Sequence, residues 1–268
     1  MKRKLAIAAG VAAAGVAILV AFLAWPRGAD PVTETEAVAA FRSRTATIAA
    51  TAASTVTPSP SLSATSLPAD GVYSFDATGG EEVKLGPLPG ETRSYPATVP
   101  VTIVRTGSCF TTTLNLIEQH TEDTTYCVGD DGTLRMQAHT KHQRVGAMSP
   151  TVEMTCDPGL LYRPGQPSQA LQCSLAFSSG PAKMSAKAEG AAQASTVSVQ
   201  IGNAARPATK LEVTYTFTGD INGTWTERTW FDADSWLPLR IERELDMKGF
   251  ATFKESSTLA LVSLEPRR

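Results

Sequence analysis

A period of two in the last quarter of the chain constrains the fold more than any other feature. Residues 210–218 alternate apolar and polar side chains at every position, and residues 224–231, 237–245 and 252–264 follow in a similar style. Consecutive side chains of a β-strand point to opposite faces, so alternation gives each run one apolar and one polar face. Short polar segments separate the four runs, and we therefore expect a four-stranded antiparallel sheet.

The alternation also predicts which side chains share a face of this sheet. The apolar face is expected to hold Leu211, Val213, Tyr215, Phe217, Trp230, Ile241 and Leu245. The polar face is expected to hold Glu227, Arg240, Glu242 and Glu244. The same register puts Arg228 and Arg243 on the apolar face, where unpaired charges are costly, so that face is expected to be covered only in part.

The connection between the first two runs contains Asn222–Gly223. Both central positions of a type I′ turn need a positive φ, which Asn and Gly adopt most readily, so this pair predicts a tight hairpin turn. Asn222-Gly-Thr224 also matches an N-glycosylation acceptor. We interpret the segment as the turn.

The preceding part of the chain continues the pattern of short strand-like runs. Residues 100–105 and 109–116 carry alternating or β-branched side chains, and a turn at Gly129–Gly132 separates residues 124–128 from 133–138. About 200 residues can bury a substantial core within one domain. We expect residues 70–268 to form a mainly β domain, built as a strongly curved antiparallel sheet or an incomplete barrel.

A long apolar run near the N-terminus has the length of a membrane span. Residues 5–25 contain no charged side chain and follow Lys2, Arg3 and Lys4. At a rise of about 1.5 Å per residue, such a helix crosses the roughly 30 Å hydrocarbon core. The basic residues favour a cytoplasmic N-terminus (residues 1–4), a single-pass anchor in the cell membrane and an extracytoplasmic remainder. A cleaved signal peptide is the alternative, although the run is longer than usual and ends without a clean cleavage site.

The chain between the apolar run and the β domain changes in composition. Residues 33–44 begin with Thr33 and acidic residues and end with two arginines, an arrangement that favours a short helix. Residues 45–69 carry no charge and consist mostly of Thr, Ser, Ala and Pro. Such a segment buries too little apolar surface to fold. We expect residues 26–69 to comprise this helix and a disordered linker that holds the domain away from the membrane.

Four cysteines, all beyond the apolar run, predict disulfides. Cys109, Cys127, Cys156 and Cys173 form an even set without the close C-x-x-C spacing of zinc ribbons. Three pairings are possible. A hairpin that turns at Glu118 places Cys109 opposite Cys127 and leaves Cys156 to pair with Cys173, and we favour this sequential pairing.

The three histidines of the chain, His120, His139 and His142, are the candidate metal ligands. A spacing of three sends His139 and His142 to opposite faces of a strand. A metal site therefore needs a helical turn or a bulge there, and a register that brings in His120. We expect separate surface histidines and no metal or other cofactor.

No motif in the sequence points to catalysis. There is no G-x-S-x-G elbow for a nucleophile, and Gly79–Gly80 does not begin a phosphate-binding loop. Acidic residues are scattered over strand faces that we expect to be exposed, so no acid/base pair stands out. The region from Asp70 onward is mildly acidic and has no basic cluster, which disfavours nucleic-acid binding. A metal-binding or hydrolytic enzyme is an alternative.

Two segments resemble known families. Residues 71–83, Gly-Val-Tyr-Ser-Phe-Asp-Ala-Thr-Gly-Gly-Glu-Glu-Val, together with Tyr95-Pro-Ala-Thr98, resemble the opening of an uncharacterised actinobacterial family of single-pass envelope proteins. That resemblance implies an anchor, a low-complexity linker and a cysteine-bearing β domain, and brings no established activity. Residues 229–243 are similar to a strand–turn–strand element of LolA- and LprG-type lipid carriers, which implies a curved sheet with an acyl chain on its concave side. Unlike the lipid-modified carriers, the chain has no cysteine before Cys109.

These features predict a membrane-anchored extracytoplasmic domain that binds a hydrophobic ligand, such as a lipid, or another envelope protein. The curved sheet beside a membrane motivates the ligand, and the absence of a catalytic grouping favours a non-enzymatic role. A protein-interaction or structural module with a filled core is the alternative. An elongated apolar cavity favours ligand binding, whereas an exposed apolar patch favours the interaction module.

Overall fold

Antiparallel strands make up most of the computed structural model, which describes residues 29–52, 67–86, 90–249 and 251–268. The one helix in these ranges is α2 (Glu34–Ala52). The strands are β1 (Gly71–Leu85), β2 (Glu91–Ser94), β3 (Thr98–Thr106), β4 (Cys109–Ile117), β5 (His120–Val128), β6 (Leu134–Gln143), β7 (Thr151–Cys156), β8 (Leu160–Tyr162), β9 (Ser168–Ser179), β10 (Ala182–Ile201), β11 (Ala204–Gly219), β12 (Ile221–Asp232), β13 (Pro238–Gly249) and β14 (Ala251–Leu261).

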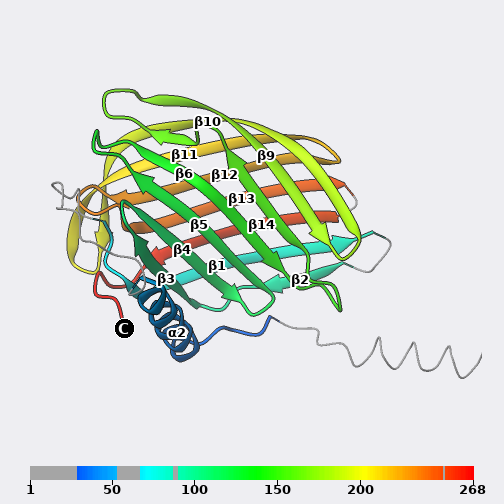
Figure 1. Ribbon diagram of the computed structural model, residues 1–268, viewed down its shortest axis with the longest axis horizontal. Helices are drawn as coiled ribbons and strands as arrows, with labels where there is room; N and C mark the ends of the chain where they lie inside the picture. The colour runs from blue at the N-terminus through cyan, green and yellow to red at the C-terminus, as the bar shows by residue number, and fades with distance from the viewer. Residues whose placement is uncertain (1–28, 53–66, 87–89, 250) are drawn as a thin grey trace, which may run out of the picture.

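The strands form one sheet that closes on itself (Figure 1). Most strands pair with the next strand in sequence, and β14 returns to pair with β1 from Phe75–Leu261 to Leu85–Ala251. Twelve strands complete the ring, while β2 pairs with β1 and β8 with β6 from the side. The prediction of a mainly β antiparallel domain is confirmed, but the barrel is closed and not incomplete. Closure leaves no unpaired strand edge around the ring.

The hairpin that joins β11 to β12 turns earlier than the sequence predicts. Phe217 pairs with Gly223, so the turn is centred on Asp220 and Asn222 lies inside β12. The prediction of a turn at Asn222–Gly223 is therefore wrong. A Cβ on Gly223 would lie 2.0 Å from the carbonyl oxygen of Asp246 on β13, so glycine is needed there for the close approach of two strands.

The position of this turn decides which side chains of β12 point into the barrel. A two-residue turn at 222–223 would pair odd-numbered with even-numbered residues, whereas a turn centred on Asp220 pairs odd with odd. The side chains of β12 consequently lie on the faces opposite to those predicted. Glu227 points inward to Arg243, while Arg228 and Trp230 lie outside.

The predictions for β11 and β13 are confirmed, because their register does not depend on that turn. The residues predicted for the apolar face of these strands are all buried: Leu211, Val213, Tyr215, Phe217, Ile241 and Leu245. Arg240 and Glu244 lie on the outer face. Arg243 is the exception to the apolar inner pattern, and its partners are described below.

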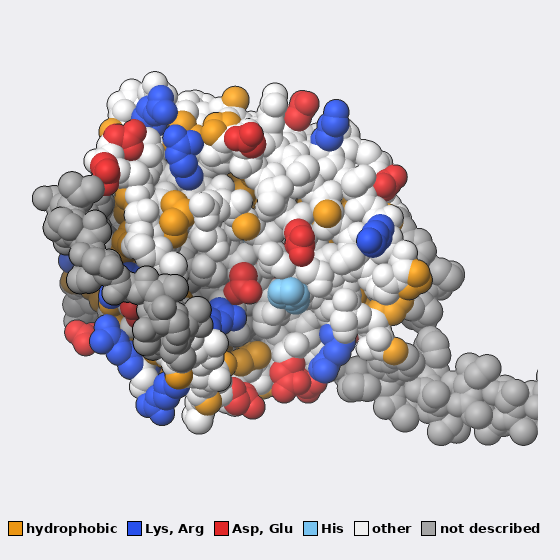
Figure 2. All heavy atoms as spheres, in the orientation of Figure 1, with side chains coloured by type: hydrophobic (Ala, Val, Ile, Leu, Met, Phe, Trp, Pro, Cys, Tyr) orange, Lys and Arg blue, Asp and Glu red, His pale blue; other side chains and the backbone are white. Residues whose placement is uncertain are grey.

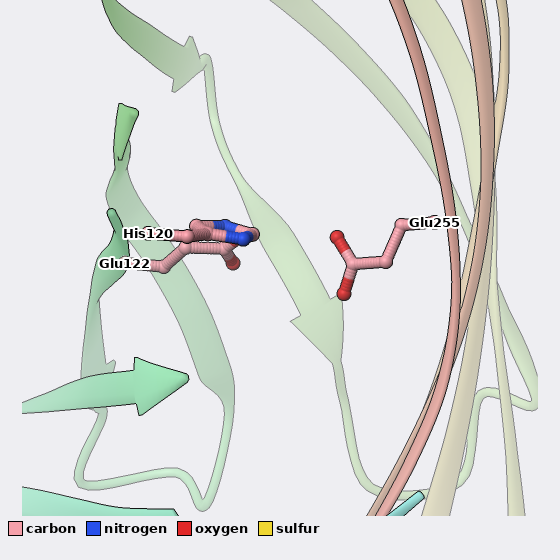
Figure 3. A group of neighbouring side chains, drawn as sticks. All are labelled: His120, Glu122 and Glu255. Carbon is pink, nitrogen blue, oxygen red and sulfur yellow. The ribbon is translucent and has the colours of Figure 1, made fainter. Parts of the chain in front are cut away.

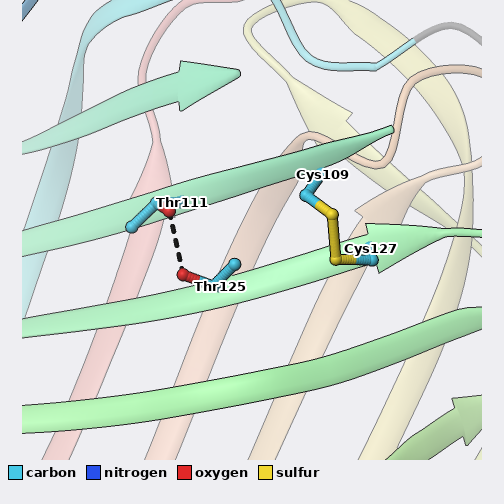
Figure 4. The surroundings of a disulfide bond; sticks show 4 residues. All are labelled: Cys109, Thr111, Thr125 and Cys127. Carbon is cyan, nitrogen blue, oxygen red and sulfur yellow. Dashed lines mark hydrogen bonds between the residues drawn. A yellow bond between two sulfur atoms is a disulfide. The ribbon is translucent and has the colours of Figure 1, made fainter. Parts of the chain in front are cut away.

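Two disulfides join neighbouring strands. The bonds are Cys109–Cys127, between β4 and β5, and Cys156–Cys173, between β7 and β9. The sequential pairing favoured from the hairpin is thus the one in the structure, and β4 turns into β5 at Glu118 as predicted. Two residues along the same strands from the first disulfide, the side-chain hydroxyls of Thr111 and Thr125 form a hydrogen bond of 2.9 Å (Figure 4). In the chain-entropy model each disulfide contributes about 3 kcal/mol of stability.

Helix α2 packs against the outside of the barrel. Thr33 and Glu36 form a reciprocal capping box, in which each side chain accepts a hydrogen bond from the backbone amide of the other residue. Phe41 is buried beside Val72 on β1 and Val104 on β3. The helix expected at residues 33–44 therefore extends to Ala52 and is part of the folded body, and not part of a free linker.

Two predicted segments fall outside the described residues. These are the membrane anchor at residues 5–25 and residues 53–66 of the linker. Within the part of the chain that the structure does describe, no helix is both long and apolar enough to cross a bilayer.

The outer surface of the barrel is polar. Figure 2 shows charged and other polar side chains spread over the face in view, with apolar side chains in small separate patches. Among the described residues, Val262 and Leu264 are the large apolar side chains that stand exposed. Most of the buried apolar side chains gather in one cluster inside the ring, and a smaller cluster lies beneath α2. The described surface thus lacks the broad apolar patch expected of an interaction module.

Candidate functional site

A group of charged side chains lies on the inner wall of the barrel. This inner charge cluster consists of Glu81 (β1), Arg93 (β2), His120 and Glu122 (β5), Lys141 (β6), Glu227 (β12), Arg243 (β13) and Glu255 (β14). Apart from Glu227, none of these residues is more than 6 % exposed. Four groups are basic and four are acidic, so the cluster can compensate its own charge, as burial away from water requires.

Lys141 and Arg243 occupy the centre of the inner charge cluster. The Lys141 ammonium lies 2.9 Å from Glu122 Oε1 and 3.0 Å from Glu255 Oε2. The Arg243 guanidinium lies 2.5 Å from Glu122 Oε2 and 3.0 Å from Glu227 Oε2. Burial alone would raise the pKa of Glu122, but Arg243, Lys141 and His120 hold it well below its usual value. The carboxylate is therefore ionised and shared among three cations.

His120 is held between two carboxylates. Its Nε2 lies 2.6 Å from Glu122 Oε1, its Nδ1 lies 2.5 Å from Glu81 Oε2, and the hydroxyl of Tyr95 lies 3.2 Å from Nδ1. Burial and Lys141 act to lower the pKa of His120, but Glu81 and Glu122 outweigh them and raise it. Burial likewise acts against ionisation of Glu81, yet His120 and Lys141 lower its pKa to about 2. With both ring nitrogens donating, His120 has no lone pair left to act as a general base.

The other two histidines both lie on β6, one inside the barrel and one outside it. His139 lies inside the barrel, where its Nδ1 is 2.9 Å from Thr124 Oγ1 and its ring is 4.9 Å from the ring of Trp225. Burial lowers the pKa of His139 to about 4, so the ring is neutral at neutral pH. His142 is exposed on the outer face. The expectation of surface histidines is thus wrong for His120 and His139. The three candidate ligands do not share one face, because residues three apart on β6 point to opposite faces.

A different trio has the spacing of metal ligands. The ligand atoms of His120, Glu122 and Glu255 all lie within 4.8 Å of one another (Figure 3). The Lys141 ammonium, however, already bonds to both of these carboxylates, and Arg243 lies 3.6 Å from the second of them. A divalent ion there would face three positive groups, since His120 is also cationic. The trio fits a metal poorly, because lysine already supplies the positive charge.

Three small hollows lie along the inner wall next to the inner charge cluster. The end hollow, about 40 Å³, lies just inside one end of the barrel, and seven of its nine lining side chains are apolar. Lys141 and Gln143 are its two polar residues. The central hollow, about 20 Å³, is bounded by the charged residues on one side and by apolar residues such as Met154 and Phe217 on the other. The inner hollow, also about 20 Å³, is lined in part by Tyr215.

These hollows form a row because neighbours share lining residues. The end and central hollows share Lys141, Val152 and Met247. The central and inner hollows share His139 and Trp225. A cavity needs about 10–15 Å³ for each water molecule it holds, so each hollow accommodates only a few waters. The interior is therefore nearly filled, with a line of weak packing that begins at one end.

Sequence patterns miss most of the inner charge cluster for a definite reason. On β5 both faces are polar, since His120, Glu122 and Thr124 alternate with Thr121 and Asp123. Period-two alternation then carries no signal about which set is buried. The prediction that acidic residues lie on exposed faces is wrong for Glu81, Glu122 and Glu255. Arg243 was the one member that the pattern flagged, as a charge on an otherwise apolar face.

No family model, no curated protein and no solved structure matches the chain. The resemblances to an actinobacterial envelope family and to LolA- and LprG-type carriers therefore stay predictions, and a function has to be argued from the site.

Proposed function

We propose that the chain is a membrane-anchored, extracytoplasmic binding protein without enzymatic activity, whose barrel holds an elongated amphiphilic ligand of the lipid class. The row of three hollows carries this proposal. Their walls are mostly apolar, and they adjoin one another along the inner wall. Sites for apolar ligands are concave, largely apolar and furnished with a few polar groups, and this row has each of these properties.

The ligand widens the hollows when it binds. An acyl chain needs more room than the few water molecules that the hollows accommodate. Met247 lines both the end and the central hollow, and Met154 lines the central one. Methionine is unbranched and has three rotatable bonds, so these side chains can turn aside at modest cost. The ligand then lies along the line from the end hollow towards Trp225.

The charge balance of the site favours an uncharged polar head group. The bases and acids of the inner charge cluster are paired with one another, so an ionised head would enter without a counter-charge. Gln143 borders the end hollow, and its Nε2 donates to Glu81 Oε2 at 3.1 Å. A hydroxyl or ester group can share hydrogen bonds with Gln143 and Lys141. We therefore propose a neutral amphiphile such as a monoacylglycerol.

A protein-interaction or structural module with a filled core is the second candidate. The small volume of each hollow favours it. The polar character of the described surface weighs against it, because Val262 and Leu264 are the large apolar side chains exposed there. Ligand binding is the better supported of the two, since the hollows adjoin one another in a row that begins at the end of the barrel.

The test is native mass spectrometry of residues 29–268 purified without detergent and then incubated with a monoacylglycerol or with the corresponding fatty acid. Val152 lines both the end and the central hollow, so Val152→Phe places an aromatic ring in the space between them. Thr155→Phe adds the same ring to the exposed face of the same strand and is the matched control. We expect a monoacylglycerol adduct on the wild type and on T155F, and its loss from V152F. Absence of an adduct from all three would support the filled-core module instead.

A further inference from the structure

The point at which the described chain begins is fixed to the barrel by a set of hydrogen bonds. The backbone amide of Asp30 donates to Gln119 Oε1 at 3.1 Å, and Gln119 Nε2 donates to Asp30 Oδ2 at 2.6 Å. The amide of Glu118 donates to the carbonyl oxygen of Asp30 at 2.8 Å. Three bonds thus hold Asp30 on the β4–β5 turn. The described chain is therefore anchored to this end of the barrel from its second residue onward.

The β4–β5 turn adjoins the end hollow. The carbonyl oxygen of Gln119 accepts a hydrogen bond of 2.7 Å from the amide of Arg144, in the β6–β7 turn. The preceding residue is Gln143, whose backbone N–H donates a hydrogen bond to the carbonyl oxygen of Pro150. Gln143 and Pro150 both line the end hollow. In Figure 1 this is the end to which the arrow of β1 points, away from the C-terminus. The attachment of Asp30 and the opening to the hollows consequently lie at the same end of the barrel.

From these contacts we propose that the barrel rests on the bilayer with the end hollow facing the lipid, so that ligand passes directly between the membrane and the barrel. The proposal rests on the membrane anchor at residues 5–25 that belongs to the proposed function. Its partner is the lipid surface itself. The uncharged linker at residues 53–66 follows α2 in the chain, so it adds nothing to the length of the tether.

Chain length makes this orientation the one that the tether permits. Three residues, Pro26 to Gly28, separate Trp25, the end of the apolar run, from Ala29, and the four steps from Trp25 to Ala29 span at most about 14 Å. Strand β5 has nine residues, so the turn at its far end lies about 30 Å from Gln119. The short tether reaches the near end of the barrel and not the far one. The expectation of a domain held well away from the membrane by a flexible coil is replaced by direct contact.

The experiment uses the full chain in nanodiscs that contain lipid with a nitroxide-labelled head group. All four native cysteines are in disulfides, so Ser149→Cys and Asp130→Cys each introduce a single thiol for a fluorophore. Ser149 is exposed in the β6–β7 turn beside the end hollow, and Asp130 is exposed in the β5–β6 turn at the opposite end. We expect the S149C label to lose most of its emission and the D130C label to keep nearly all of it.

Two results would overturn the proposed orientation. Equal quenching of both labels means that the barrel lies on its side, and no quenching of either means that it stands off the membrane. A flexible ten-residue Gly/Ser insertion between Gly28 and Ala29 serves as a control, since it should relieve the quenching of S149C without altering the barrel. Failure of the chain to enter the nanodisc would contradict the anchor, and hence the proposed function, whereas loss of orientation with ligand binding intact would contradict only this inference.

Discussion

Two walls of the same barrel are stabilised in different ways. The wall made by β5, β6, β13 and β14 points His120, Glu122, Lys141, Arg243 and Glu255 inward, whereas the wall made by β9, β10 and β11 points almost only apolar side chains inward. Apolar contacts contribute in proportion to buried area, and they are non-directional. Buried charges contribute only while every partner is present. The charged wall therefore behaves as a unit and the apolar wall as a sum of parts.

Loss of one carboxylate from the charged wall should have the largest effect. Glu122 lies 2.5–2.9 Å from groups of His120, Lys141 and Arg243, so Glu122→Ala leaves three buried cations short of a partner. We expect the free energy of unfolding, measured by urea denaturation, to fall by about 3–5 kcal/mol. Glu244→Ala, on the outer face of β13 with its side chain 68 % exposed, is the control and should cost less than about 1 kcal/mol. Similar costs for both variants would mean that the charged wall does not act as a unit.

A cavity in the apolar wall should cost somewhat less and should not depend on pH. Leu211 on β11 is 1 % exposed, and Leu211→Ala removes buried methyl groups without uncovering a charge. We expect a loss of about 3 kcal/mol, the same at pH 5 and pH 8, from urea midpoints at both values. A pH-dependent loss for L211A would show that the two walls are energetically coupled.

Acid should weaken the charged wall in a window set by His139. Its pKa is lowered to about 4 in the folded state by burial, against about 6.5 in the unfolded chain. Between these values the unfolded chain binds a proton that the folded chain does not, so stability falls as pH falls, with a slope of up to about 1.4 kcal/mol per pH unit. His139→Gln should flatten the stability curve between pH 6.5 and 4. An unchanged slope would contradict the burial of a neutral ring.

His120 should change the pH dependence of stability in the opposite direction to His139, and the same urea measurements test it. Its pKa is raised in the folded state by Glu81 and Glu122, so its contribution to stability is present below pH 6.5 and is lost as pH rises through the folded value. His120→Gln should therefore remove stability mainly at acid and neutral pH. Glu81 and Glu255, whose pKa values are lowered in the folded state, add a further loss as pH falls below about 4.3.

Local pairing explains what could be predicted. The β4–β5 hairpin brings Cys109 opposite Cys127 through a turn close in sequence, so counting residues from Glu118 was enough to favour the bond. For β12 the predicted faces are wrong. The turn is centred on Asp220 and not on Asn222–Gly223, so every side chain of β12 points to the face opposite to the predicted one. Glu227 therefore points into the barrel and Trp230 lies outside, the reverse of the prediction. Because side chains alternate between the two faces of a strand, a small error in the position of a turn can assign every side chain of the strand to the wrong face.

The sequence by itself predicted a mainly β domain, the antiparallel order of its last four strands and the helix that follows Thr33, and it favoured the sequential disulfide pairing. These depend on side chains within one hairpin or one helical turn. The closure of the ring was decided only in the tertiary structure, because Phe75 pairs with Leu261 and no local pattern connects them. The inner charge cluster was decided there too: Glu81, Glu122 and Glu255 come from strands far apart in the chain, and burial could favour them only once closure had brought Lys141 and Arg243 within reach.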